Sequence, residues 1–299
     1  MLPTYNRADY LEQALLSALA QDPGPEQMQI EVVDNSSTDA VQQVVSRLGS
    51  SRVVLYHEPK RINPTEGMNL CLTRARGQWV HILHDDDFTQ PGFYTQAAEV
   101  FNHRPEVGAV LVRNDTVDPN GRRLELSRLL RPTPGVLDGW LETIAVTNNL
   151  QYVSIAVRRE VYETVGAFDP RLRYAADWDM WKRIAMRYPV WYLPEPLASY
   201  RIHPGSDSTR LVRTAGIAAD TRLAIELSGD YLPPAEAPRL MRLARRYYAR
   251  SALNRGMRYL LEGKGTAGLA HLREGWKTYP SVWHTLRVVL GGARRALRR

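Results

Sequence analysis

The chain has 299 residues, of which 44% are hydrophobic and 24% charged, with one cysteine and a formal net charge of +7. Length and composition indicate a globular protein with room for one large domain or two smaller ones. The single cysteine, Cys71, excludes an intrachain disulfide framework and predicts a reducing, cytoplasmic location. No apolar stretch reaches the roughly 20 residues that cross a bilayer, and residues 1–10 lack the apolar core of a signal peptide.

The N-terminal half alternates helical and strand patterns. Amphipathic and β-branched runs predict a helix over residues 10–20, strands over residues 28–34, 52–58 and 78–84, and helices after residue 39 and over residues 66–76. Asp39 is predicted to cap the second helix and Gly77 to end the third. This alternation predicts a doubly wound, mostly parallel sheet with helices on both faces.

The middle of the chain is less regular and the end is helical. The patterns predict a strand over residues 107–115, a turn over 118–123, a strand and short helix over 151–169, a helix over 176–188 and a proline-broken extended segment over 190–203. We place a domain boundary between residues 210 and 211. An α/β domain (residues 1–210) would then precede a small basic α-helical domain (residues 211–299).

Positive charge is concentrated near the end of the sequence. Residues 239–299 contain 15 Lys or Arg and two acids, for a net charge of +13, which leaves −6 for the remainder. Such asymmetry predicts an anionic surface or partner for the tail. A solvated helix face is the alternative, and both interpretations stay open.

The sequence HILHDDDF, residues 81–88, ends a predicted buried strand in three aspartates. Two carboxylates at close range repel by roughly 4 kcal/mol at an effective dielectric near 20, so a cation, backbone donors or water must offset them. If the extended backbone continues, His84 and Asp86 face one side, and Asp85 and Asp87 the other. Oxygen ligands with one imidazole suit Mg²⁺ or Mn²⁺. A solvated acidic turn is the alternative.

Six segments together resemble the glycosyltransferase family 2 pattern, in the family's order and spacing across residues 1–208. They are PTYNRADYLEQALLSALAQ, IEVVDNSSTD, ARGQWVHILHDDDF, VGAFDPRL, ADWDMWKRI and SYRIHPGS. The resemblance implies the GT-A fold and a hexosyltransferase that takes its sugar from a nucleotide-sugar donor. It also implies a glycan or lipid-linked acceptor, as in polysaccharide biosynthesis for the cell envelope.

The resemblance implies roles for individual residues. Asp34 would accept a hydrogen bond from the nucleobase, although an ordinary turn aspartate is the alternative. Mn²⁺ or Mg²⁺ would be the cofactor. The implied donor-binding residues are Pro3, Thr4, Tyr5, Asp34, Asn69, His84 and Asp85. The implied metal ligands are Asp86 and His203, supported from behind by Asp87 and Arg201.

Asp177 aligns with the family's general base, whereas Ala176 replaces its usual glutamate neighbour. The base would take a proton from the acceptor hydroxyl, while the ion neutralises the departing nucleoside diphosphate. The resemblance implies a single displacement with inversion. A helix N-cap is the alternative role for Asp177, and both roles are compatible, because a helix N-terminus would keep this carboxylate ionised.

Two departures from the family pattern keep other functions open. Family members carry a full apolar strand before Pro3, where this chain has only Met1 and Leu2, which predicts a truncated first strand. Met68 replaces the family's donor-loop arginine, and Arg61 is a candidate to compensate. An inactive nucleotide-sugar-binding homologue is therefore one alternative. A sugar-1-phosphate nucleotidylyltransferase is a second, disfavoured because PTYNRADY lacks the glycines of a triphosphate-binding loop.

Residues 281–299 are predicted to form a basic amphipathic helix. Its apolar positions are 282, 286, 289, 290, 293 and 297, and its arginines are at 287, 294, 295, 298 and 299. Such a helix can lie on an anionic membrane, which predicts peripheral contact with the inner face of the membrane. Packing on its own domain is the alternative. Nucleic acid is not an expected partner, because the sequence has no aromatic platform or groove-binding motif.

Overall fold

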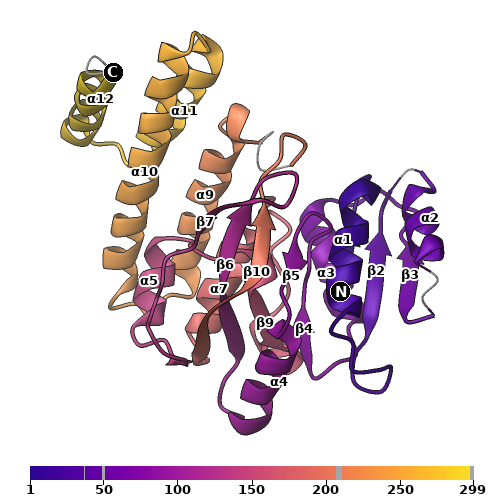
Figure 1. Ribbon diagram of the computed structural model, residues 1–299. Coiled ribbons are helices and arrows are strands. Elements are labelled where there is room, and N and C mark those ends of the chain that lie inside the picture. The colour runs from indigo at the N-terminus through magenta and orange to yellow at the C-terminus, as the bar shows by residue number, and fades with distance from the viewer. Residues whose placement is uncertain (37, 49–50, 207–210, 297–299) are drawn as a thin grey trace. The chain divides into compact units, whose positions relative to one another are not determined.

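The computed structural model describes residues 1–36, 38–48, 51–206 and 211–296, and the side chains of residues 292–296 lie outside the description. The chain divides into two compact units (Figure 1). The first unit comprises Met1–Trp140, Asn149–Pro170 and Arg183–Ile202. The second comprises Leu141–Asn148, Arg171–Lys182 and His203–Arg299. The boundary predicted between residues 210 and 211 adjoins residues 207–210, which lie outside the described residues, so it stays a prediction.

The first unit begins with a parallel three-stranded sheet in the order β1-β2-β3. Its strands are β1 (Leu2–Thr4), β2 (Ile30–Asp34) and β3 (Val53–His57). The helices that follow them in turn are α1 (Ala8–Leu19), α2 (Ala40–Arg47) and α3 (Pro64–Arg74). Figure 1 shows α1 and α2 beside β2 and β3, which is the alternation that the sequence predicts. The strand expected to be truncated is present as β1, with three residues.

A second, mixed sheet completes this unit in the order β4-β9-β6-β10-β5, with β7 on β6 and β8 on β10. Its strands are β4 (Trp79–His81), β5 (Phe88–Thr89), β6 (Ala109–Val117), β7 (Arg123–Leu126), β8 (Gly135–Val136), β9 (Ile155–Arg158) and β10 (Val190–Arg201). Strands β6 and β10 pair in parallel and the other pairings are antiparallel. The backbone N–H of Leu83 donates to the Met1 carbonyl at 3.0 Å, which links the two sheets.

Helices and a continuous apolar core complete the first unit. The helices are α4 (Phe93–His103) and α6 (Arg159–Val165), with a 3-10 turn, η1 (Tyr152–Ser154), before β9. Leu15, Val32, Phe93 and Val110 are among the buried core side chains that both sheets share. The predicted α/β fold is confirmed, and the predicted parallel arrangement holds throughout the first sheet, whereas among the described strands of the second sheet it holds for β6 and β10 alone.

Several boundaries differ from the sequence prediction, each for a local reason. Helix α3 begins two residues early, because Asn63 and Glu66 form a reciprocal capping box. It ends at Arg74, since Ala75 is already extended, and not at Gly77. Asp39 occupies the N-cap position of α2, yet its side chain accepts no capping hydrogen bond from the described residues. Strand β10 runs unbroken through its prolines, which cause register shifts between Leu193 and Ala198.

The second unit is helical, as predicted for the C-terminal region. Its helices include α7 (Ala176–Ala185, which continues into the first unit), α9 (Gly216–Leu227), α10 (Ala237–Leu261), α11 (Gly265–Thr278) and α12 (Val282–Ala296). The helix α5 (Trp140–Val146), apart from Trp140, and the 3-10 turn η2 (Ser228–Asp230) also belong to it. Helices α10 and α11 form a hairpin. They touch at glycines: a Cβ atom on Gly256 would lie 2.9 Å from the carbonyl oxygen of Gly268.

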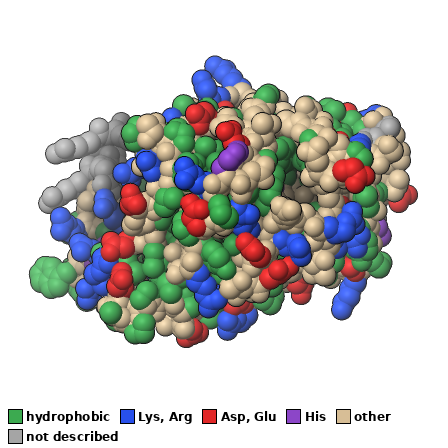
Figure 2. All heavy atoms as spheres, turned by 90° about the horizontal axis from the view of Figure 1, so that it is seen from below, with side chains coloured by type: hydrophobic (Ala, Val, Ile, Leu, Met, Phe, Trp, Pro, Cys, Tyr) green, Lys and Arg blue, Asp and Glu red, His purple; other side chains and the backbone are tan. Residues whose placement is uncertain are grey.

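Within the described residues, no helix combines the length and the apolar character that crossing a lipid bilayer requires. On the face shown in Figure 2, basic and acidic side chains are interspersed. The high positive charge of the whole chain is therefore not gathered into one patch on that face.

Candidate functional site

The last residues of the first three strands lie side by side at one edge of the parallel sheet. The strand register pairs Thr4 with Asp34, and Asp34 with His57. The buried Asp34 carboxylate accepts a hydrogen bond from the Ser36 backbone N–H at 2.8 Å and lies 3.2 Å from Nδ1 of His57. Carboxyl ends of parallel strands form the ligand crevice of open α/β sheets. The predicted donor residues Thr4 and Asp34 are thus brought together.

The turn between β1 and α1 is hydrogen-bonded to the aspartate-rich segment that follows β4. Asn6 adopts a left-handed conformation, with φ of 54°, which asparagine tolerates better than most residues. Just before it, the Thr4 hydroxyl donates to Asp85 at 2.6 Å and the Tyr5 backbone N–H donates to the same carboxylate at 3.4 Å. Asp85 therefore fastens the residues after β1 to the turn that carries the other aspartates. Pro3 is half-buried in β1 itself, where it pairs with Val33.

The three aspartates lie in a turn, and the predicted alternation of their side chains is wrong. Strand β4 ends at His81, and the backbone N–H of Asp87 donates to the His84 carbonyl at 3.2 Å. The turn changes the direction in which each side chain points. His84, Asp86 and Asp87 each offer one ligand atom, and these atoms all lie within 4.8 Å of one another. One imidazole and two carboxylates form a donor set that suits Mn²⁺ or Mg²⁺.

Burial makes this turn electrostatically costly. The side chains of Asp85, Asp86 and Asp87 are all buried. Burial and the neighbouring Asp86 carboxylate raise the pKa of Asp85 to about 7 and raise the pKa of Asp87 well above its usual value. The guanidinium of Arg7 partly offsets this charge, since its Nη1 lies 3.3 Å from Asp85 and 3.0 Å from Asp86. A divalent ion would offset more of the charge, which is consistent with the donor set.

Arg201 holds the turn from behind. It is buried, with 2% of its surface exposed. Its backbone N–H donates to Asp87 at 2.9 Å and its Nε donates to the Asp86 carbonyl at 2.8 Å. The other guanidinium nitrogens donate to Gln13, at 2.5 Å, and to the carbonyls of Asp118 and Pro119. The hydrogen bonds of Arg201 therefore stabilise the conformation of the turn.

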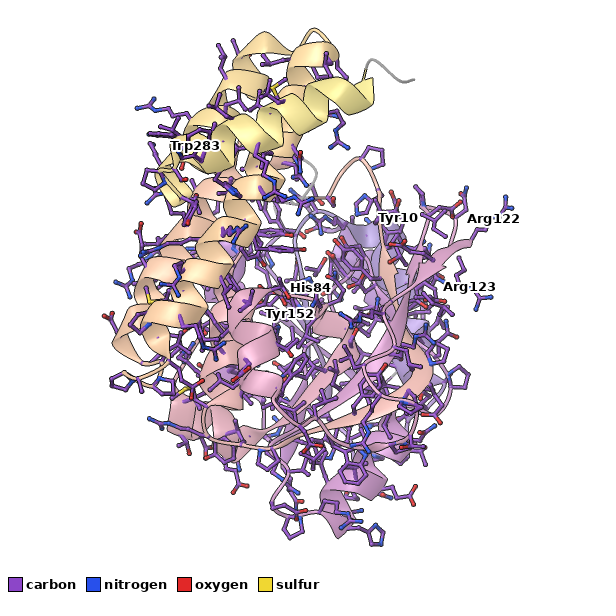
Figure 3. The ribbon with its side chains drawn as sticks, turned by 90° about the vertical axis from the view of Figure 1, so that its left-hand side faces the viewer. Tyr10, His84, Arg122, Arg123, Tyr152 and Trp283 are labelled. Carbon is purple, nitrogen blue, oxygen red and sulfur yellow. The ribbon has the colours of Figure 1, made fainter. Side chains whose placement is uncertain are left out.

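Aromatic rings flank the turn in the first unit. The His84 ring packs against Tyr152, with centroids 4.6 Å apart, and Figure 3 shows the two side chains together. At the end of β1, the guanidinium of Arg61 lies 5.5 Å from the centroid of the exposed Tyr5 ring. Arg61 thus reaches the predicted nucleoside side, whereas Met68, in the place of the family's arginine, is buried.

Asn69 uses its side-chain amide inside the protein. Its Nδ2 donates to the Phe168 carbonyl at 2.9 Å, and its Oδ1 accepts from the Phe168 backbone N–H at 2.8 Å. These two bonds tie α3 to the segment after α6. The predicted contact of Asn69 with the donor stays a prediction.

Asp177 lies in the second unit, in the first turn of α7, which begins at Ala176. It is therefore inside the helix, one residue beyond its start, and not at the N-cap. Its Oδ2 accepts from the Asn148 amide at 3.0 Å and its Oδ1 accepts from the Trp178 backbone N–H at 2.6 Å. Burial nevertheless raises the pKa of Asp177 to about 7. Desolvation therefore outweighs the hydrogen bonds from Asn148 and Trp178, which favour the ionised form, so the expectation that the helix N-terminus keeps this carboxylate ionised is wrong near neutral pH.

His203 also belongs to the second unit and is buried. Its backbone carbonyl accepts from the Ser206 N–H at 3.2 Å, which closes a turn after β10. Among the described residues, the group of side chains placed to hold a metal ion consists of His84, Asp86 and Asp87, and His203 is not part of it. Metal ligation by His203 stays a prediction.

Sequence reasoning missed Arg7, His57 and Asn148. Each acts over a long sequence separation: Arg7 lies 78 residues from Asp85, and Asn148 lies 29 residues from Asp177. A basic residue directly before the first helix is the only local signal for Arg7. His57 ends a strand beside Asp34, so the predicted parallel register could have identified it.

The sequence matches the family described as "Glycosyl transferase family 2" over residues 1–166. Among curated proteins, the chain is similar to the succinoglycan biosynthesis protein ExoO of Rhizobium meliloti, with 29% identity over 190 residues. That match covers 60% of this chain and 52% of ExoO, so the chain spans about half the length of this relative.

Two solved structures share the fold. TarS 1–349 of S. aureus, in complex with UDP-GlcNAc, has a TM-score of 0.66 at 16% identity and covers 93% of this chain and 90% of its own. The mannosyltransferase PcManGT of Pyrobaculum calidifontis, in complex with GDP-Man and Mn²⁺, has a TM-score of 0.58 at 20% identity, over 99% of this chain and 85% of its own. At such identities the likeness shows the fold alone.

The role of Arg201 in holding the aspartate turn leads to a stability prediction. Replacing it with lysine (Arg201→Lys) keeps the positive charge but removes the planar fork that serves several acceptors at once. We expect the free energy of unfolding to fall by roughly 2–4 kcal/mol. Urea denaturation measures this, with Arg122→Lys as the matched control at an exposed arginine. A loss below about 0.5 kcal/mol, the range of ordinary surface changes, would contradict the role.

Proposed function

The chain belongs to glycosyl transferase family 2, and from this premise we propose that it transfers a hexose from a nucleotide-diphosphate donor to a hydroxyl of a glycan or lipid-linked acceptor. The observation that carries the proposal is the turn after β4, where His84, Asp86 and Asp87 bring three ligand atoms within 4.8 Å of one another. Divalent ions of the Mg²⁺ type are commonly held by one or two carboxylates together with substrate phosphates. The turn thus has the chemistry to receive a nucleoside diphosphate.

The donor is proposed to bind along the carboxyl ends of β1 and β2. Asp34 already accepts a hydrogen bond from Ser36, and a carboxylate has further lone-pair sites with which it could accept one from a nucleobase N–H. Pro3, Thr4 and Tyr5 would flank the nucleoside, and Arg61 over the Tyr5 ring adds a cation near it. The complexes of TarS with UDP-GlcNAc and of PcManGT with GDP-Man support a nucleotide sugar as the donor class.

Asp86 is the proposed principal ligand of the ion, with His84 and Asp87 beside it and His203 as a further candidate. When bound, Mn²⁺ or Mg²⁺ would supply positive charge that stabilises the departing diphosphate. Mn²⁺ is the first ion to test, because it is present in the PcManGT complex. Arg7, Asp85 and Arg201 would keep the ligand-bearing turn in shape, through the contacts described above.

Asp177 is the proposed general base. It would accept the proton of the acceptor hydroxyl as that oxygen forms a bond to the anomeric carbon. The bond from that carbon to the diphosphate oxygen breaks, and its electron pair leaves with the nucleoside diphosphate. One base and one such step produce inversion at the anomeric carbon. A pKa near 7 suits a base that works near neutral pH, where part of the population is ready to accept a proton.

The family match favours sugar transfer over nucleotidylyl transfer. The alternative of an inactive nucleotide-sugar-binding homologue rests on Ala176 and Met68. Against it, Asp34, Asp86 and Asp177 are all present and each is held in place by hydrogen bonds or ion pairs. Transfer activity itself separates these two functions.

A peripheral contact with an anionic membrane is proposed through α12. Val288 on this helix is buried, whereas Val282, Trp283, Leu286 and Leu290 are 59%, 85%, 47% and 56% exposed. Figure 3 shows the Trp283 side chain projecting from the helix. Arg246 and Arg250 of α10 and Arg287 of α12 lie close enough to His284 to lower its pKa. Apolar side chains flanked by cations complement an anionic bilayer surface. The arginines at positions 294, 295, 298 and 299 are also predicted to contribute to membrane binding, but their side chains are not among those that the structure describes.

The donor and ion proposal predicts stabilisation by mass action. In Mn²⁺, the true nucleotide sugar at 100 times its Kd should raise the free energy of unfolding by about 2.7 kcal/mol. Chelation with EDTA should remove the gain, and so should Asp86→Asn, which deletes a ligand charge without changing side-chain size. Thermal denaturation across a panel of nucleotide sugars measures this, with exposed Glu106→Gln as the control. Equal stabilisation of wild type with and without Mn²⁺ would refute the ion's role.

The base proposal predicts a selective loss of turnover. Asp177→Asn should lower kcat at least 100-fold while donor affinity stays near wild type, since a general base contributes about 10²–10⁴-fold. In wild type, kcat should fall as the pH drops through about 7, because a protonated Asp177 cannot accept a proton. Steady-state rates with donor titration between pH 5.5 and 9 measure both effects. Exposed Asp230→Asn is the control, and an Asp177→Asn variant with wild-type kcat would exclude this residue as the base.

The membrane proposal predicts co-flotation with vesicles that contain about 30% phosphatidylglycerol and little with pure phosphatidylcholine, because each surface cation adds roughly 1 kcal/mol only on an anionic surface. The double variant Trp283→Ser, Leu286→Ser should lose most of this binding. Leu269→Ser, which changes a 62% exposed side chain on α11, should not. Recovery of the double variant equal to that of wild type would rule out α12 as the contact.

A further inference from the structure

Within the second unit, residues of the C-terminal helices α9 and α10 contact the segment around Asp177. We propose that Asp220 of α9 and Tyr248 of α10 are positioning residues for Asp177, so that these helices are part of the catalytic apparatus. This inference rests on the proposed role of Asp177 as the base. It concerns two residues that the family resemblance does not reach, because that resemblance ends at residue 208.

Asp220 fixes the backbone directly before α7. Its carboxylate accepts hydrogen bonds from three successive backbone N–H groups, those of Arg173, Tyr174 and Ala175, at 3.2, 2.8 and 2.8 Å. Groups at a helix N-terminus lack partners within their own helix, and an anionic side chain there is favourable. Because Ala175 is two residues before Asp177, Asp220 sets where the first turn of α7 begins.

Tyr248 is linked to each oxygen of the Asp177 carboxylate through one other residue, Asn148 for Oδ2 and Trp178 for Oδ1. Its hydroxyl accepts from the Asn148 backbone N–H at 2.9 Å, and the Asn148 amide donates to Oδ2 of Asp177 at 3.0 Å. Its ring packs on the Trp178 indole, with centroids 4.9 Å apart, and the Trp178 backbone N–H donates to Oδ1 at 2.6 Å. The Trp178 indole is itself fixed by its bond to the Ile144 carbonyl at 2.5 Å.

These partners shift the pKa of Asp177 in opposite directions. The charged and titratable groups that influence this cluster are Asp220 from α9, Tyr247, Tyr248 and Arg255 from α10, and Tyr174 from the segment before α7. Hydrogen bonds from Asn148 and Trp178 favour the ionised carboxylate, whereas the negative charge of Asp220 disfavours it. Burial raises the pKa of Tyr248, so its hydroxyl stays neutral at physiological pH.

Because the two residues shift the pKa of Asp177 in opposite directions, measuring that pKa in variants distinguishes a positioning role from a merely structural one. Tyr248→Phe removes the acceptor that orients Asn148, so the pKa of Asp177 should rise by about half a unit or more. Asp220→Asn removes a nearby negative charge, so the pKa of Asp177 should fall by a similar amount. Arg242→Lys, a charge-conserving change at an exposed position of α10, should leave it unchanged.

Titration of the full-length protein labelled with ¹³C at aspartate Cγ measures this pKa directly, with the Asp177→Asn spectrum to assign the resonance. In parallel, Tyr248→Phe should lower kcat about tenfold with the donor KM unchanged, as expected when a reacting group is misplaced, and the midpoints of both kcat profiles should follow the pKa shifts. An Asp177 pKa that stays unchanged in both variants would overturn the inference. If the pKa values shift as expected while Asp177→Asn keeps its turnover, the positioning network stands and the proposed base is wrong.

Discussion

The first unit depends on the stabilisation of adjacent negative charges in a buried turn. Three consecutive aspartates follow β4, and water does not solvate them freely because all three side chains are buried. Two arginines from distant parts of the sequence make this possible: Arg7 contacts the carboxylates of Asp85 and Asp86, and Arg201 binds the turn through its backbone and guanidinium groups. The first strand, the last strand and the turn between them are thereby held to one another.

The electrostatics of the turn are consistent with the proposed cation. Arg7 and Arg201 together contact the carboxylates or carbonyl groups of all three aspartates. The pKa values of Asp85 and Asp87 remain raised by burial and mutual repulsion despite these arginines. Further positive charge would be favourable there. Structure and electrostatics thus agree with the chemistry expected of this family.

Much of the fold followed from local patterns in the sequence. The alternation of β-branched runs with amphipathic helices correctly identified β2, β3 and β4 together with α1, α2 and α3, because such periodicity reflects which face of each element is buried. Local signals also placed the aspartates at a strand end. They did not predict the turn that gathers His84, Asp86 and Asp87, since the bond from Asp87 to the His84 carbonyl is formed only when the chain stops being extended. Arg7, Asn148 and the burial of Asp177 depend on contacts between distant segments, which no local pattern contains.

The glycine contact between α10 and α11 limits how this protein can diverge. A Cβ atom on Gly256 or on Gly268 would lie within about 3.0 Å of the other helix, so this close approach requires a glycine of each helix to face its partner. One residue inserted between positions 248 and 256 would turn the glycine away from α11 by about 100° relative to Tyr248. Substitutions on the solvent side of α10 can therefore accumulate, whereas changes in its length within this stretch would uncouple the hairpin from the tyrosine. Homologues that use this tyrosine are expected to conserve that eight-residue spacing.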